Sequence, residues 1–302
     1  MTPGVRQRAI LAARGQTAVT ASATDRLEVA TAQGGLRFDA NLKWLFTDLP
    51  FERRFAASAE QGFEAVEIPA PYPYPTDRLR KWLAEADLQL VLINSPGGEA
   101  GSPTAYGNAC HPDAVSEFRA GFELALEYAT ALDTPLVHLM AGVVPESVPH
   151  DLAKGTYLEN LGWAADQAGQ TEVTILVEVL NQRDVPGFVL RSLAEGAAAI
   201  AEAGGSQTLM LFDFYHAQVN EGDLTTKWRE LSSIVGHVQV GDTPDRHEPG
   251  TGELCWDYLF GEIAEVYDGW IGCEYQPATD TASGLGWRQK YADAAHRTKR
   301  AR

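Results

Sequence analysis

The sequence predicts a single-domain (β/α)8 barrel, the TIM barrel of the α/β class, over residues 36–292. Short apolar runs alternate with longer helical patterns, and the alternation repeats eight times within a length typical of such barrels. The competing fold is a doubly wound open sheet, which would require a glycine-rich turn after its first strand. The chain has Ala40-Asn41-Leu42 at that point, so the barrel is favoured.

Each expected strand is a short run rich in Val, Ile, Leu or Phe between polar turns. In chain order these runs cover residues 36–40, 65–68, 88–94, 136–140, 174–180, 209–214, 237–240 and 269–274. Helices are expected over residues 51–61, 77–86, 113–131, 157–169, 190–203, 224–233 and 256–266. Ser192 and Glu195 form a predicted capping box, and Gly62 and Gly204 stand where helices usually end.

The two ends of the chain differ from the rest in composition. Residues 1–35 are rich in Ala, Thr and Gln and lack a strand-like run, so we expect a disordered N-terminal extension. Their arginines and few acidic residues also fit an organelle transit peptide, which is the less favoured alternative. Residues 293–302 form a basic C-terminal tail.

Composition restricts the partners that this chain can have. Lys and Arg number 24 against 41 Asp and Glu, and the resulting net charge of −17 argues against a nucleic acid partner. No apolar run reaches the roughly 18 residues of a membrane span, so we expect no membrane partner. Three cysteines are too few for a disulfide framework, which favours a reducing, cytoplasmic location. A small-molecule enzyme is therefore the default expectation.

Oxygen-bearing side chains stand at the ends of four consecutive predicted strands: Glu178, Asp213, Gln239 and Glu274. Because the carboxyl ends of all strands meet at one mouth of a barrel, we expect these side chains to converge. Three carboxylates and a carboxamide would repel one another unless a cation lay between them. An all-oxygen set suits Mg²⁺ or Mn²⁺ better than zinc, so we predict one such divalent ion. The alternative for any single residue is a salt bridge with a loop arginine.

Four further polar residues follow these strand ends and are candidates for substrate binding: Asp184, His216, Arg246 and His247. We expect His216 to donate a hydrogen bond to a substrate oxygen and Arg246 to bind a substrate carboxylate with two parallel hydrogen bonds. The alternatives are a loop histidine bonded to backbone and a solvated arginine. His138 and His237, which lie within predicted strands, are interpreted as satisfied interior histidines.

Several short motifs between about residue 38 and residue 288 carry a family resemblance. The most specific is Arg246-His247-Glu248-Pro249-Gly250-Thr251-Gly252-Glu253. The others are Asn41-Leu42-Lys43-Trp44-Leu45-Phe46, Met140-Ala141-Gly142, Asn181-Gln182-Arg183-Asp184-Val185-Pro186-Gly187, Asp213-Phe214-Tyr215-His216, Gly236-His237-Val238-Gln239, Gly272-Cys273-Glu274-Tyr275 and Gly284-Leu285-Gly286-Trp287. In these motifs the chain resembles the hydroxypyruvate isomerase family of the xylose isomerase-like TIM barrels.

The resemblance implies a metal-dependent aldose–ketose isomerase that takes hydroxypyruvate to tartronate semialdehyde (2-hydroxy-3-oxopropanoate) through an enediolate. It implies that the four residues at the strand ends hold the metal and that Glu178 and Glu274 also transfer the proton. Assembly into a homo-oligomer is implied as well. Val179 stands where the family pattern has a proline, and this departure can change which substrate fits.

Other functions remain open on the same barrel. A 2-oxo-tetronate isomerase or a ketose 3-epimerase would differ mainly in pocket size, and a dehydratase is less favoured. A metal-dependent endonuclease would need additional histidine ligands and a basic groove, which the net charge of −17 opposes. A non-catalytic sugar-binding barrel would not require the pair Glu178 and Glu274.

Overall fold

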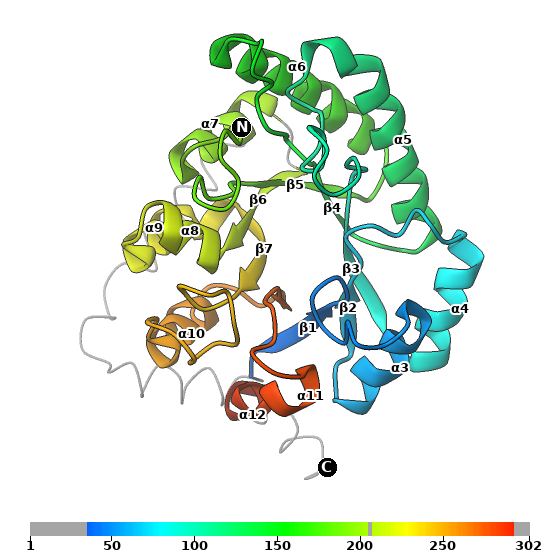
Figure 1. Ribbon diagram of the computed structural model, residues 1–302, viewed down its shortest axis with the longest axis vertical. Coiled ribbons are helices and arrows are strands. Elements are labelled where there is room, and N and C mark those ends of the chain that lie inside the picture. The colour runs from blue at the N-terminus through cyan, green and yellow to red at the C-terminus, as the bar shows by residue number, and fades with distance from the viewer. Residues whose placement is uncertain (1–34, 205–206, 293–302) are drawn as a thin grey trace, which may run out of the picture.

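The computed structural model describes residues 35–204 and 207–292, which form one closed barrel of parallel strands surrounded by helices (Figure 1). Neighbouring strands follow chain order from β1 to β8, and β8 closes the barrel by pairing with β1. The predicted (β/α)8 fold is therefore confirmed. The predicted N-terminal extension, apart from Gly35, and the predicted tail at 293–302 lie outside the described residues.

The strands coincide with the predicted apolar runs to within one or two residues at each end. They are β1 (Arg37–Asn41), β2 (Ala65–Glu67), β3 (Gln89–Asn94), β4 (Leu136–His138), β5 (Thr174–Glu178), β6 (Thr208–Asp213), β7 (Val235–Val240) and β8 (Trp270–Cys273). These runs are nearly continuous in hydrophobicity because helices cover the outer face of the sheet while side chains fill its interior.

Helices pack around the outside of the barrel (Figure 1). They are α3 (Phe51–Glu60), α4 (Thr76–Ala86), α5 (Val115–Ala131), α6 (His150–Ala168), α7 (Leu193–Ala203), α8 (Phe214–Asn220), α9 (Leu224–Leu231), α10 (Trp256–Ala264), α11 (Thr281–Gly284) and α12 (Gly286–Ala292). Large side chains such as Phe55, Phe122, Trp228 and Phe260 are fully buried between this layer and the strands. Within the described ranges, no helix is both long and apolar enough to cross a membrane.

The start and end of α7 confirm the local signals in the sequence. Ser192 Oγ accepts a hydrogen bond from the backbone N–H of Glu195, and the Glu195 carboxylate accepts one from the backbone N–H of Arg191. Gly204 ends the helix with a φ of 72°, a left-handed conformation that glycine adopts without strain.

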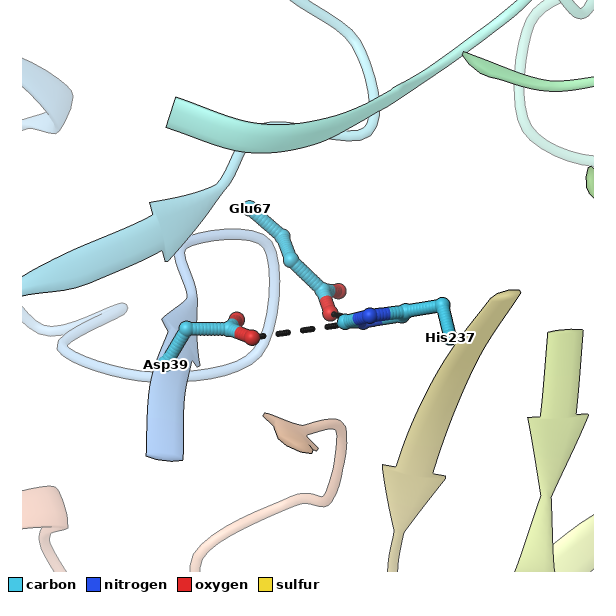
Figure 2. A group of neighbouring side chains, drawn as sticks. All are labelled: Asp39, Glu67 and His237. Carbon is cyan, nitrogen blue, oxygen red and sulfur yellow. Dashed lines mark hydrogen bonds and ion pairs between the residues drawn. The ribbon is translucent and has the colours of Figure 1, made fainter. Parts of the chain in front are cut away.

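The interior of the barrel is filled by layers of inward-pointing side chains. A layer nearer the amino ends of the strands is apolar and contains Ala65, Leu176 and Leu211. The next layer toward the carboxyl ends is polar: Asp39, Glu67 and His237 are fully buried there. Figure 2 shows these three side chains pointing toward one another from β1, β2 and β7. This polar layer supports the mouth of the barrel from below.

Candidate active site

A cavity of about 410 Å³ opens at the mouth of the barrel, where the carboxyl ends of the strands meet. Its wall is formed by Lys43, Trp44, Asn94, Tyr106, His138, Met140, Glu178, Leu180, Asp184, Val185, Tyr215, His216, Arg246, Glu274 and Gln276. A hollow of about 520 Å³ lies at the opposite end, against the start of β4 and β5, and holds none of the predicted site residues. The mouth cavity is therefore the candidate site.

The structure brings the four predicted metal ligands together. Glu178 and Asp213 end β5 and β6, Gln239 lies opposite Asp213 in β7, and Glu274 directly follows β8. Glu178, Asp213 and Gln239 are buried, and the Glu274 side chain is 16% exposed. Contacts through Arg246 join Asp213 to the cavity wall. Ligand atoms of Glu178 and Asp213 lie within 4.8 Å of each other, and Arg246 links Asp213 to Glu274.

The two oxygens of Asp213 have separate tasks. Oδ1 accepts hydrogen bonds from the backbone N–H groups of Tyr215 at 2.7 Å and His216 at 3.4 Å, and so caps α8. Oδ2 lies 2.7 Å from Nη2 of Arg246. The sequence did not predict α8, which this cap starts immediately after β6.

Arg246 is the cation of the site. Its Nη2 donates to Asp213 Oδ2 at 2.7 Å and to Glu274 Oε1 at 2.8 Å. The guanidinium carbon lies 4.8 Å from the ring centres of both Trp44 and Tyr215. Burial alone would lower the pKa of Arg246, but the charges of Asp213 and Glu274 raise it, so the side chain stays protonated.

The two predicted proton-transfer residues have different environments. Glu274 accepts hydrogen bonds from Asn41 Nδ2 at 2.9 Å and from Arg246, whereas Oε1 of Glu178 is buried and has no partner. Burial raises the pKa of Glu274 to about 7, although Arg246 opposes the shift. Burial, followed by repulsion from Glu274 and Asp213, raises the pKa of Glu178 well above its ordinary value.

Hydrogen bonds fix the tautomer of His216. Its Nδ1 accepts from the backbone N–H of Asn181 at 3.1 Å, so the neutral ring carries its proton on Nε2. Burial, followed by the charge of Arg246, lowers the pKa of His216 well below its ordinary value. Nε2 lies 3.9 Å from Glu178 Oε1 and 3.6 Å from Asp213 Oδ2. His216 Nε2 thus faces both carboxylates as a hydrogen-bond donor, and the three side chains also form a group close enough to hold a metal ion.

The other predicted substrate-binding residues are divided between the cavity and its surroundings. Asp184 lines the cavity, where its carboxylate accepts hydrogen bonds from Tyr215 at 2.6 Å and Asn181 at 3.0 Å. His247 is not part of the cavity wall, and its Nδ1 lies 2.7 Å from the backbone oxygen of Gln276. Gln276 itself lines the cavity.

Sequence reasoning missed the role of His138 in the cavity wall. It was interpreted as a satisfied interior histidine, but its Nδ1 lies 3.5 Å from Glu178 Oε2 and its Nε2 is buried without a partner. Burial, with a smaller effect of Lys43, lowers the pKa of His138 to about 3, so the ring is neutral. A position at the end of β4 was the signal for this role, as it was for Glu178 on β5.

A buried hydrogen-bond network beneath the mouth was missed as well. Oε2 of Glu67 accepts from Asn41 Nδ2 at 2.7 Å and from Gln239 Nε2 at 2.8 Å, and Oε1 lies 2.6 Å from His237 Nε2. Gly272 makes room for this network, since a Cβ there would lie 2.0 Å from Glu67 Oε1. Because its nitrogen is bound to Glu67, the Gln239 amide keeps its oxygen free for another partner.

The four predicted ligands fit a hard divalent cation. Glu178 Oε1 and Gln239 Oε1 are buried acceptors without hydrogen-bond partners, and buried acceptors normally have one. Asp213 Oδ2 and Glu274 Oε1 are already arranged around one positively charged nitrogen of Arg246. The donor atoms are all oxygens, as Mg²⁺ and Mn²⁺ prefer. Asp213 and Glu274 also form salt bridges with Arg246, which is the alternative to metal binding that the sequence left open.

Comparison with known proteins places the chain among isomerases of one fold family. A family model described as "xylose isomerase-like TIM barrel" matches residues 55–291. The 2-oxo-tetronate isomerase of Cupriavidus necator is 40% identical over 257 residues, which are 84% of this chain and 98% of that protein. The hydroxypyruvate isomerase of Escherichia coli is 38% identical over 257 residues, or 85% and 99% of the two chains.

Solved structures agree with the fold. A crystal structure named as AP endonuclease, family 2, from Brucella melitensis has a TM-score of 0.81 and 38% identity, and the match covers 85% of this chain and 99% of that one. A D-psicose 3-epimerase from Clostridium cellulolyticum H10 has a TM-score of 0.66 at 16% identity, with 88% and 99% covered. At that identity the likeness concerns the fold alone.

Proposed function

Because this chain belongs to the xylose isomerase-like TIM barrel family and is an isomerase, we propose that it is a metal-dependent isomerase of small hydroxy-oxo acids. Hydroxypyruvate is the first proposed substrate and tartronate semialdehyde the product. The alternative substrate is a 2-oxo-tetronate, for which the Cupriavidus relative is named. The observation that carries the proposal is that two carboxylates with different hydrogen-bond environments, Glu178 and Glu274, face one cavity.

The reaction moves a carbonyl from C2 to C3 of hydroxypyruvate without net oxidation. The C3–H bond breaks and a C2–H bond forms, while the hydroxyl proton passes from O3 to O2 through an enediolate. A divalent ion held by the four strand-end residues would stabilise the negative charge of the enediolate and acidify the C3–H bond. The protein must supply a base, an acid and a donor to the oxygens.

Glu274 is the base in this proposal. Hydrogen bonds from Asn41 and Arg246 favour its ionised form, which can accept the C3 proton. Glu178, which faces the same cavity, returns a proton to C2. In the reverse direction the two exchange tasks.

His216 binds a substrate oxygen from its Nε2–H. The backbone N–H of Asn181 fixes this tautomer, and the lowered pKa keeps the ring neutral, so it donates one proton and carries no charge. A neutral donor assists the transfer between O3 and O2 without competing with a metal ion for the carboxylates.

Turnover of metal-stripped protein tests the proposal. We expect conversion of hydroxypyruvate to tartronate semialdehyde, followed with a coupled reductase, only when Mg²⁺ or Mn²⁺ is added. Glu178→Gln and Glu274→Gln should each lower kcat by at least about 100-fold. Glu123→Gln, at an exposed position of α5, is the matched control and should leave kcat unchanged. The mechanism would be contradicted if kcat were the same with and without added metal, or if both substitutions left kcat unchanged.

The same assay separates the rival functions. Activity with a 2-oxo-tetronate but not with hydroxypyruvate keeps the mechanism and changes the substrate. Activity with an uncharged ketose alone would favour a 3-epimerase, and release of water with an irreversible product would favour a dehydratase. The name of the Brucella structure raises nuclease activity, and cleavage of abasic DNA by the metal-loaded protein would overturn the isomerase proposal.

A further inference from the structure

The basic side chains around the cavity differ in whether they already have a partner within the protein. Arg246 is held by Asp213 and Glu274. His138 Nδ1 lies 3.5 Å from Glu178 Oε2, and His216 Nδ1 accepts a hydrogen bond from the backbone N–H of Asn181. Lys43 also lines the cavity, and no ion pair to its ammonium occurs within the described part of the chain. Lys43 is therefore the cation of this wall that is available to a ligand.

Backbone hydrogen bonds fix Lys43 at the mouth. It lies in the turn directly after β1, where its backbone N–H donates to Asn41 Oδ1 at 3.1 Å. The backbone N–H groups of Trp44 and Leu45 donate to the Asn41 carbonyl at 3.1 and 2.9 Å. Since Asn41 Nδ2 is in turn bonded to Glu67 and Glu274, this turn is tied to the centre of the site.

The ammonium group extends over the cavity from this turn. Lys43 Nζ lies 5.8 Å from the centre of the Trp44 ring, which also lines the cavity. Lys43 shares the cavity wall with Glu274, beside β8, and with His138, on β4. An exposed lysine on this wall lies where a bound anion would be attracted.

Negative charge on the other part of the wall strengthens this preference. Asp184 lines the cavity after β5, and hydrogen bonds from Tyr215 and Asn181 help keep it ionised. A substrate carboxylate would be repelled by Asp184. It is therefore directed toward the turn after β1, with the reacting carbons nearer Glu178 and Glu274.

We propose that Lys43 binds the carboxylate of the substrate and thereby selects hydroxy-oxo acids over uncharged ketoses of the same size. This inference rests on the proposed isomerase function and specifies the substrate class of its site. It assigns the carboxylate to Lys43 rather than to Arg246, for which the sequence suggested this role. In the structure Arg246 Nη2 is instead bonded to Asp213 Oδ2 and Glu274 Oε1.

Two substrates that differ only at the carboxylate test the proposal. Hydroxypyruvate carries the carboxylate, and dihydroxyacetone carries an uncharged CH₂OH group in its place. For Lys43→Met we expect KM for hydroxypyruvate to rise by about 10- to 100-fold, the usual effect of losing a charged hydrogen bond, with kcat changed little. The kcat/KM for dihydroxyacetone should be unchanged or higher. Lys43→Arg should restore most of the affinity for hydroxypyruvate.

Controls exclude a structural effect. Lys81→Met removes a lysine that is 69% exposed on α4 and should leave KM unchanged for both substrates. Thermal unfolding of Lys43→Met should match that of the wild type, because the lysine side chain is exposed. Equal changes of KM for both substrates, or none for either, would overturn the proposal.

A binding experiment keeps the test independent of turnover. Glycerate, which has a carboxylate but no carbonyl, can be titrated calorimetrically into wild type and Lys43→Met loaded with Mn²⁺. We expect at least about 10-fold weaker binding to the variant. Equal affinities of the two proteins for glycerate would refute the role of Lys43. Failure of the wild type to isomerise either substrate would refute only the proposed function.

Discussion

Replacing Asp39 by asparagine should stabilise the protein at neutral pH. Asp39 is fully buried in the interior of the barrel, and neither of its carboxylate oxygens has a hydrogen-bond partner. Its Oδ2 lies 3.9 Å from His237 Nε2 (Figure 2). Burial, followed by repulsion from Glu67, raises the pKa of Asp39 well above its ordinary 3.8. The asparagine amide has the same shape, carries no charge and can donate permanently to Glu67.

The size and the pH dependence of the effect follow from this burial. An unsatisfied buried polar group costs about 1–3 kcal/mol, so the free energy of unfolding should rise by this amount at pH 7. Below about pH 4, Asp39 is protonated in both the folded and unfolded states and contributes no difference. As pH rises, only the unfolded chain releases the proton, and the wild type loses about 1.4 kcal/mol per pH unit until the folded group titrates. The advantage of Asp39→Asn should therefore grow with pH.

Denaturant unfolding between pH 4 and pH 8, with a chelator present, measures this difference. A gain of 1 kcal/mol corresponds to about 2–4 °C in Tm for a domain somewhat smaller than this one. Asp166→Asn, at an exposed position of α6, is the matched control and should show no growing difference. If Asp39→Asn were less stable than wild type at pH 7, the ionised form of Asp39 would be the one that the folded protein stabilises. That result would refute the reasoning.

Three further predictions concern the metal ligands and two glycines. Burial raises the pKa of both Glu178 and Asp213, and a divalent ion needs both ionised, so Mn²⁺ should bind more tightly at pH 8 than at pH 6 in calorimetry; equal affinities would contradict the assignment. Gly272→Ala should lower the free energy of unfolding by about 1–3 kcal/mol, because its Cβ would lie 2.0 Å from Glu67 Oε1; an unchanged denaturation midpoint would be inconsistent with the close packing described. Gly155→Ala, inside α6 with nothing within 4 Å of the new Cβ, should instead raise the unfolding free energy by about 0.5–1 kcal/mol, and a loss would show an unrecognised contact.

The fold and the convergence of four side chains were predictable because they depend on periodicity. Side chains along a strand point alternately into and out of the barrel. The direction of a polar side chain at the end of each of the eight strands therefore follows from its place in this alternation. Glu178 and Asp213 stood out because their runs are otherwise apolar. Their roles as metal ligands stay predictions.

The remaining parts of the site depend on contacts that no local pattern contains. Glu67 has the same sequence signal as Glu178, a carboxylate at the end of an apolar run, yet its run is so short that its inward direction was not evident. His247 stood in the most specific motif, but the loop turns its ring to the Gln276 carbonyl. Lys43 lies in a turn whose shape comes from the Asn41 side chain, which sequence spacing does not determine.

Asp213 shows how strongly one position can be constrained when it serves two neighbours. One of its oxygens starts α8, which carries Tyr215 and His216, and the other meets Arg246. An evolving sequence could replace the helix cap with serine or the charge with glutamate, but each exchange would lose the other task. Substitution of Asp213 is therefore restricted both by the helix that it caps and by the charge that it pairs with Arg246. Changes in substrate preference should instead arise in loops such as the turn after β1.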